Sequence, residues 1–299
     1  MQRISDHRTP AEPLPLRPAA LRARTFNCMG TVVSLTLPST SGADELVAAT
    51  AVVEQLFAGL DEAFSLYRPD SEASRIARAE IMLPDASEDM RRLYADAAGW
   101  RLVTEGAFTP ERPDGVLDLS GIVKGHAIQE AGTSLLALGL RDWCLNAGGD
   151  VLVHGSPVPA SAGDGTTESG SPAPGSGQPW RAGIVDPADR RTLIAGYPLG
   201  GPPGAKLALA TSGSAERGDH IWTAGAGRGS VSVAGGGRAA PAFRQVSVAA
   251  ADIVTADVLA TAIVAGGLPM LDRATDGWEI EVLAARTGGE LLATPGFRR

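Results

Sequence analysis

The chain has 299 residues and a formal net charge of −8, from 26 Lys and Arg against 34 Asp and Glu. Because no basic run offsets this negative charge, nucleic acid is not expected as the main partner. Hydrophobic residues make up 44% of the chain, which is enough for a sizeable core. We find no stretch near the roughly 18 apolar residues of a membrane-spanning helix, so no membrane span is expected.

The N-terminal residues are rich in proline and arginine and contain no continuous apolar region. We therefore expect no secretory signal, a cytoplasmic location, and reduced thiols at Cys28 and Cys144. Residues 1–24 are predicted to form a disordered arm, and residues 25–299 to form one domain. Residues 155–179 are nearly all small, polar or proline, and are predicted to form a flexible insertion within that domain.

In the first half of the chain, strand and helix patterns follow one another. Alternation predicts a strand over 31–37, and apolar residues at helical spacing predict a long amphipathic helix over 42–67. Further helices are predicted over 87–106 and from about 122 to 138. Residues 141–155 have the pattern of two buried strands joined by a Gly-Gly turn.

The second half is richer in strand patterns, which occur within 180–199, 206–225 and 243–251. A buried helix is predicted over 255–267, and a closing hairpin with a Gly-Gly turn over 278–294. Since strands and helices do not alternate regularly, the sequence predicts an α+β fold with mixed or antiparallel sheets and packed helices.

The segment "DLSGIVKG" (118–125) combines Asp118, a glycine just before a predicted helix, and Lys124 one turn into it. Free N–H groups at a helix start bind anions, and a lysine ammonium reinforces this binding. The spacing is not that of a P-loop. On local spacing, the alternative is a capped helix with an exposed lysine.

Two other segments concentrate polar residues. "NAGGD" (146–150) fits a hairpin turn, followed by Asp150. "TSGSAERGDH" (211–220) ends in His220. The other three histidines lie in less suitable positions, so His220 is the preferred candidate for a general base. A structural histidine is the alternative. Hydroxyls at Thr211 and Ser212 are weaker candidates for holding a phosphate or an acceptor loop.

Asp257 and Thr261 lie four residues apart, on one face of an otherwise apolar predicted helix. A buried carboxylate is costly unless it is paired or binds a cation. A carboxylate, a hydroxyl and a backbone carbonyl form an oxygen set that suits Mg²⁺. The alternative is a charge at the helix N-terminus and a threonine bonded to its own backbone.

In this order, the segments resemble the FAD:protein FMN transferases of the ApbE type. The resemblance covers nearly everything after the first 25 residues, except 155–179 and the glycine-rich stretch after Trp222. The interval between "GAFTP" and "DLSG" is shorter here than in other members. The matching segments are "MGT" (29–31), "FSLYRPDSEASRI" (64–76), "GAFTP" (106–110), "DLSGIVKG", "NAGGD", "ATSGSAERGDHI" (210–221), "TADVLATA" (255–262) and "TPGF" (294–297).

The resemblance implies an ApbE-like fold related to the tunnelling fold (T-fold). It also implies Mg²⁺-dependent transfer of FMN from FAD to a Thr or Ser hydroxyl of a target flavoprotein, with release of AMP. His220 matches the position implicated in catalysis, and the Mg²⁺ ligands would be Asp257, Thr261 and the carbonyl of Gly121. The residues that would contact FAD are Met29, Tyr67, Gly106, Ala107, Phe108, Asp118, Lys124 and Ile221.

Two other functions stay open for the same residues. Water in place of the hydroxyl acceptor would make the protein an FAD pyrophosphatase that yields FMN and AMP. The sequence after His220 reads "HIWTAG", where the family usually continues with an Asp-Pro turn. This departure leaves open a non-catalytic FAD-binding protein.

Overall fold

The main sheet is antiparallel and has eight strands in the order β1-β2-β3-β4-β7-β8-β9-β10. It is seen in a computed structural model that describes residues 20–158, 177–213 and 241–298. The strands are β1 (Leu21–Cys28), β2 (Thr31–Pro38), β3 (Trp143–Ala147), β4 (Asp150–His154), β7 (Ala208–Gly213), β8 (Phe243–Ala250), β9 (Glu281–Arg286) and β10 (Leu291–Ala293).

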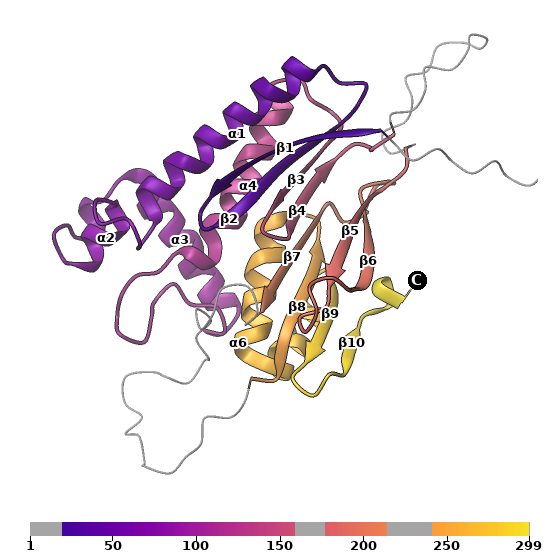
Figure 1. Cartoon of the computed structure of the whole chain (residues 1–299). Helices are drawn as coiled ribbons and strands as arrows, with labels where there is room; N and C mark the ends of the chain where they lie inside the picture. The colour runs from indigo at the N-terminus through magenta and orange to yellow at the C-terminus, as the bar shows by residue number, and fades with distance from the viewer. Residues whose placement is uncertain (1–19, 159–176, 214–240, 299) are drawn as a thin grey trace, which may run out of the picture.

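Helices cover one face of this sheet (Figure 1). The long helix α6 packs on β7 and β8, α4 packs on α6, and α1 packs on both α4 and β1. The helices are α1 (Ala43–Phe64), α2 (Glu72–Ala77), α3 (Glu88–Val103), α4 (Ser120–Ala137) and α6 (Ile253–Gly277). The arrangement confirms the predicted α+β class with antiparallel strands and packed helices.

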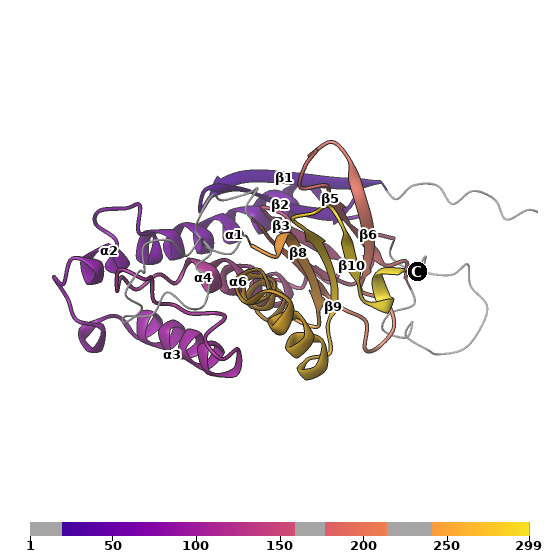
Figure 2. The same cartoon turned by 90° about the horizontal axis from the view of Figure 1, so that it is seen from below.

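The central strands are buried on both faces, and alternate residues enter two different cores. On β4, Leu152 joins the larger core under the helices, whereas Val151 and Val153 join a smaller core. A two-stranded hairpin of β5 (Trp180–Val185) and β6 (Leu193–Leu199) covers this smaller core. Figure 2 shows this hairpin and the helices on opposite sides of the sheet. This double burial explains why the middle of β4 is a continuous apolar run, Val151–Leu152–Val153.

Most predicted elements are confirmed, but two boundaries need correction and one helix was not predicted. The predicted arm ends too late, because residues 21–24 pair with β2 as part of β1. Helix α2, which the sequence did not predict, has six residues and is capped by Ser71, whose hydroxyl accepts the Ser74 N–H. The predicted helix over 255–267 is too short, because α6 continues to Gly277 across a kink at Gly267, where φ is 65°. Most of the predicted 155–179 insertion lies outside the described residues.

One helix of the described chain, α6, is long and apolar enough to cross a membrane. Its most apolar window of 18 residues has a mean hydropathy of 1.7. The expectation that no stretch approaches this length is therefore wrong. Of that window, 56% is buried inside the structure, where it packs on β7 and β8. A core helix passes the same test, so this length and composition are weak support for a membrane span.

Both cysteines are free thiols in the structure, as predicted. Cys144 packs against the smaller core, and burial raises the pKa of its thiol to about 12. The pKa of Cys28 is also raised, first by burial and then by the charge of Asp61. Since the thiolate is the reactive form, neither thiol is activated.

Gly132→Ala is expected to lower the free energy of unfolding by about 1–3 kcal/mol through overpacking. A Cβ on Gly132 of α4 would lie 2.9 Å from Leu152 Cδ2 and 2.9 Å from the Trp143 ring, and both side chains are buried. This cost exceeds the gain of about 1 kcal/mol that alanine brings to a helix.

Gly59 on α1 is the matched control, because a Cβ there would meet no atom within 4 Å. Gly59→Ala is expected to raise the free energy of unfolding by up to about 1 kcal/mol. Urea unfolding of both variants measures the difference. Equal effects at the two glycines would show that the contact between α4 and the sheet is not tight.

Candidate functional site

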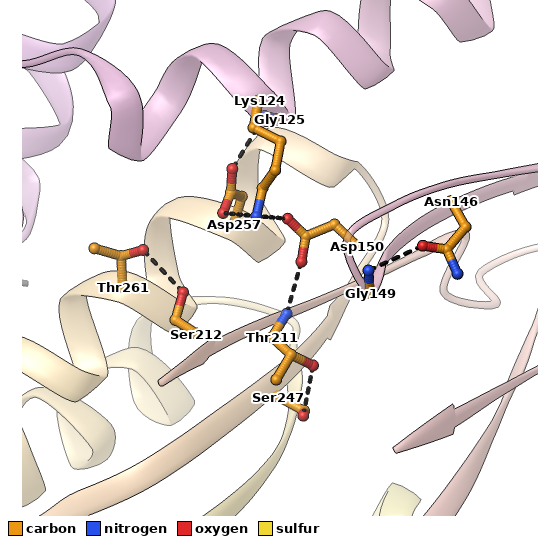
Figure 3. A network of polar contacts seen from close by, with 10 residues as sticks. All are labelled: Lys124, Gly125, Asn146, Gly149, Asp150, Thr211, Ser212, Ser247, Asp257 and Thr261. Carbon is orange, nitrogen blue, oxygen red and sulfur yellow. Dashed lines mark hydrogen bonds and ion pairs between the residues drawn. The ribbon is translucent and has the colours of Figure 1, made fainter. Parts of the chain in front are cut away.

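A buried group of three charged side chains lies where α4, α6 and the sheet meet. Lys124 is 6% exposed, Asp150 is 0% exposed and Asp257 is 3% exposed. The Lys124 ammonium contacts Asp150 Oδ2 directly and lies 3.7 Å from Asp257 Oδ1 (Figure 3). Charges at this depth are stable only when they are paired, so these three residues form one electrostatic unit, the ion cluster.

The β3–β4 turn places Asp150 in the ion cluster. Gly148 and Gly149 both have positive φ, 62° and 94°, which is the geometry of a tight two-residue hairpin turn. Asp150 follows as the first residue of β4, and its Oδ1 accepts the Thr211 N–H of β7 at 2.9 Å. The carboxylate is thereby held against the sheet from two strands.

Helix α6 presents the other carboxylate to the first turns of α4. Asp257 Oδ2 accepts the Gly125 N–H at 3.0 Å. In a regular helix, this N–H donates to the carbonyl four residues back, which here is that of Gly121. Asp257 therefore lies against the turn of α4 that carries the Gly121 carbonyl.

Hydroxyl groups continue the polar network along β7. Thr261, one turn after Asp257 on α6, shares a hydrogen bond of 3.0 Å with the Ser212 hydroxyl. The Thr211 hydroxyl shares one of 2.8 Å with Ser247 of β8. Figure 3 shows both hydroxyl pairs beside the ion cluster. The weaker sequence candidates Thr211 and Ser212 thus lie in the same network as Lys124.

Two of the local alternatives from the sequence are wrong. Lys124 is not an exposed lysine on a capped helix, because its side chain is buried and paired with Asp150. Asp257 and Thr261 are not an isolated helix charge and a threonine bonded to its own backbone. They contact α4 and β7, respectively.

Several predicted FAD contacts surround the start of α4. Asp118 Oδ1 accepts the Ser120 N–H at 3.0 Å, which helps to begin the helix. The buried Phe108 ring packs on Gly121, where a Cβ would lie only 3.0 Å from the ring. Ala107 is also buried, and Gly106 has a φ of 82° in the turn after α3. These residues and Lys124 therefore border one end of α4.

Met29 lies in the β1–β2 turn, and Tyr67 follows the end of α1. Met29 has a φ of 49° in the β1–β2 turn and packs against the large core, while Tyr67 is 82% exposed. The charges of Asp61 and Arg68 both affect the pKa of Cys28, which places the β1–β2 turn beside the α1 end that carries Tyr67. His220 and Ile221 lie outside the described residues, in the segment that begins directly after β7.

Asp150 was missed as a site residue. Its local sequence is that of an ordinary hairpin turn, and the hairpin is confirmed. The available signal was a carboxylate at the start of a strand, "DVLVH", in which the next three residues are apolar. A charged residue in a strand that is buried on both faces needs a partner of opposite charge. The chain has only two lysines that could supply an ammonium.

The described residues hold no group of three or more His, Cys, Asp or Glu side chains that would bind a metal. The Mg²⁺ set predicted from the sequence contains only one such side chain, Asp257, together with a hydroxyl and a carbonyl. Asp257 lies against the turn of α4 that carries the Gly121 carbonyl, and Thr261 follows one turn later on α6. All three members are hard oxygen donors of the kind that Mg²⁺ prefers. The donor atoms of these residues are therefore of the type that fits a magnesium ion.

The fold and the site define an α+β protein with a buried polar site between two helices and an antiparallel sheet. The model of the ApbE family matches residues 29–113 and 109–282. The protein therefore belongs to the ApbE family. The two matches share residues 109–113.

Solved structures with the same fold span almost the whole chain. Flavin transferase ApbE from Vibrio cholerae has a TM-score of 0.65 and 21% identity, and the match covers 94% of this chain and 99% of that one. The ApbE protein from Thermotoga maritima has a TM-score of 0.68 and 19% identity, over 93% and 98%. Flavinyl transferase ApbE from Pseudomonas stutzeri, in its apo form, has a TM-score of 0.65 and 20% identity, over 95% and 97%. The comparison with curated proteins gave no match.

Proposed function

We propose that this protein is an FAD:protein FMN transferase that moves the FMN part of FAD onto a Thr or Ser hydroxyl of a target flavoprotein and releases AMP. Membership of the ApbE family supports the class of reaction. The observation that carries the proposal is the buried ion cluster of Lys124, Asp150 and Asp257, because desolvating charges costs several kcal/mol per ion and such costs are concentrated at functional sites.

Asp257, Thr261 and the Gly121 carbonyl would hold Mg²⁺. When bound, the ion would neutralise negative charge on the pyrophosphate oxygens. Lys124 would supply a second positive charge on the same side, from a position that Asp150 maintains. Phe108 and Asp118 would fix the start of α4 against which the substrate binds.

In the proposed reaction, the acceptor hydroxyl oxygen forms a bond to the phosphorus of the FMN half. The bond between this phosphorus and the bridging oxygen breaks, and AMP leaves with that oxygen. His220 would accept the proton of the hydroxyl. Holding the hydroxyl and the pyrophosphate in line contributes much of the rate enhancement in reactions of this kind.

The test is an incubation of the purified protein with FAD, MgCl₂ and a candidate FMN-binding domain. We expect a covalent yellow product on the acceptor, with the mass of one FMN added, and one AMP released for each acceptor modified. Matched acceptors with Thr or Ser replaced by Val or Ala are the control and should stay unmodified.

Two other outcomes would contradict the proposed transfer. AMP and free FMN without an adduct would identify an FAD pyrophosphatase. FAD that stays intact for hours with MgCl₂ and several acceptors present would identify a non-catalytic flavin-binding protein. Chelation of the metal should stop the transfer, and activity that persists with excess chelator would contradict the Mg²⁺ dependence.

A further inference from the structure

The Lys124 ammonium lies between two buried carboxylates and is not shared equally. It is in direct contact with Asp150 Oδ2, while Asp257 Oδ1 is 3.7 Å away. We propose that Asp150 is a positioning residue, which holds the ammonium away from Asp257 so that it does not compete with a divalent cation for that carboxylate. This inference rests on the proposed function, since it concerns the metal expected at Asp257.

Asp150 is suited to this role because it is rigidly placed. Its Oδ1 accepts the Thr211 N–H at 2.9 Å, and the residue is completely buried at the start of a strand. A Cβ on Gly148, two residues earlier, would lie 2.4 Å from Thr31 Oγ1, so the turn packs closely against β2. By contrast, the ammonium is carried on the flexible four-carbon stem of lysine.

Asp257 is equally fixed, but from the helix side. Its Oδ2 accepts the N–H of Gly125, the residue next to Lys124. The distance between the Asp257 carboxylate and the root of the lysine side chain is therefore set by the backbone. Which carboxylate holds the ammonium depends on the lysine rotamer, and in this structure the direct contact is with Asp150.

The charge on Asp150 is the property that matters. An asparagine in its place keeps the oxygen that accepts the Thr211 N–H but loses the negative charge that holds the ammonium. The nearest carboxylate is then Asp257, and a short movement of Nζ would form a direct ion pair with it. That pair would occupy an oxygen that a divalent cation needs as a ligand.

The experiment measures Mn²⁺ binding by the electron paramagnetic resonance signal of the free ion. The full-length protein is titrated with Mn²⁺ alone, and then again at an FAD concentration that saturates each variant. We expect Asp150→Asn to weaken Mn²⁺ binding by about 10- to 100-fold, as substitutions next to metal ligands do. Asp150→Asn combined with Lys124→Met should bind Mn²⁺ about 10-fold more tightly than Asp150→Asn alone, because the competing ammonium is gone.

Weaker Mn²⁺ binding by Asp150→Asn could come from movement of the Lys124 ammonium or from the changed net charge of the site. A crystal structure of the metal-free variant distinguishes these two causes. The inference expects Lys124 Nζ within hydrogen-bond distance of Asp257 Oδ1, and an ammonium that stays beside residue 150 would overturn it. Ser247→Ala is the matched control. It removes a buried partner of Thr211 but does not touch Lys124, so Mn²⁺ affinity should not change.

The remaining outcomes also have definite meanings. If Asp150→Asn binds Mn²⁺ as the wild type does, the inference fails while the proposed metal site stands. If the double variant binds no better than Asp150→Asn, the role of Asp150 is structural and the inference is wrong. If the wild type binds no Mn²⁺ with or without FAD, the metal part of the proposed function fails, and this inference fails with it.

Discussion

Lys124→Met is expected to lower the free energy of unfolding by about 3–5 kcal/mol, the cost of removing one partner from a buried ion pair. Methionine keeps nearly the same length and volume, so the packing around α4 is preserved. The loss comes from Asp150 and Asp257, which stay buried without the ammonium that lies beside both. Urea unfolding of the variant and the wild type measures this difference.

The other lysine of the chain provides the control. Lys206 donates to the Glu279 carbonyl at 2.6 Å in an exposed position, so Lys206→Met is expected to cost less than about 1 kcal/mol. Combining Lys124→Met with Asp150→Asn should recover part of the lost stability, since it removes a charge from each side of the pair. A loss below about 1 kcal/mol for Lys124→Met would mean that the ion cluster is open to water.

Asp257→Ala is expected to reduce FMN transfer by at least about 10²–10³-fold, the usual effect of losing one electrostatic group from an active site. The substitution removes the only carboxylate of the proposed Mg²⁺ set. The assay follows the FMN adduct on the acceptor at saturating FAD. Because Lys124 keeps its contact with Asp150, the variant is expected to stay folded.

Asp252→Ala makes the same substitution at the start of the same helix. Asp252 caps α6 by accepting the Thr255 N–H at 2.8 Å, so its loss should cost about 1 kcal/mol of stability but leave transfer intact. Wild-type activity in Asp257→Ala would show that the site assignment is wrong. Equal losses in both variants would indicate that damage to α6, and not the loss of a metal ligand, explains the effect.

Some predictions from the sequence stay untested by the fold. The role of His220 and the contact of Ile221 with FAD concern residues that the structure does not describe. The relation to the tunnelling fold, the cytoplasmic location and the nature of the acceptor hydroxyl also stay predictions. Each depends on a partner, a compartment or a segment beyond the described contacts.

The errors in predicting elements have local physical causes. In β1, the first five residues are all exposed, so "LRART" has no buried face and its arginines continue the proline- and arginine-rich composition of the arm. Helix α2 has only six residues, too few for a helical period to be visible. Gly267 suggested the end of a helix, but its positive φ produces only a kink, after which α6 continues.

By itself, the sequence determined most of the strands and helices, the hairpin at "NAGGD" and the placement of Asp257 and Thr261 on one helix face. These features depend on residues a few positions apart, whose geometry the backbone sets locally. Only the tertiary structure decided that Lys124 is buried and that Asp150 holds it. Asp150 is 26 residues from Lys124 and 107 from Asp257, and only the packing of α4 and α6 on the sheet brings the three charges together. Because the cost of burying a charge depends on what surrounds it, the burial of Lys124 in "DLSGIVKG" depends on residues far from it in the chain.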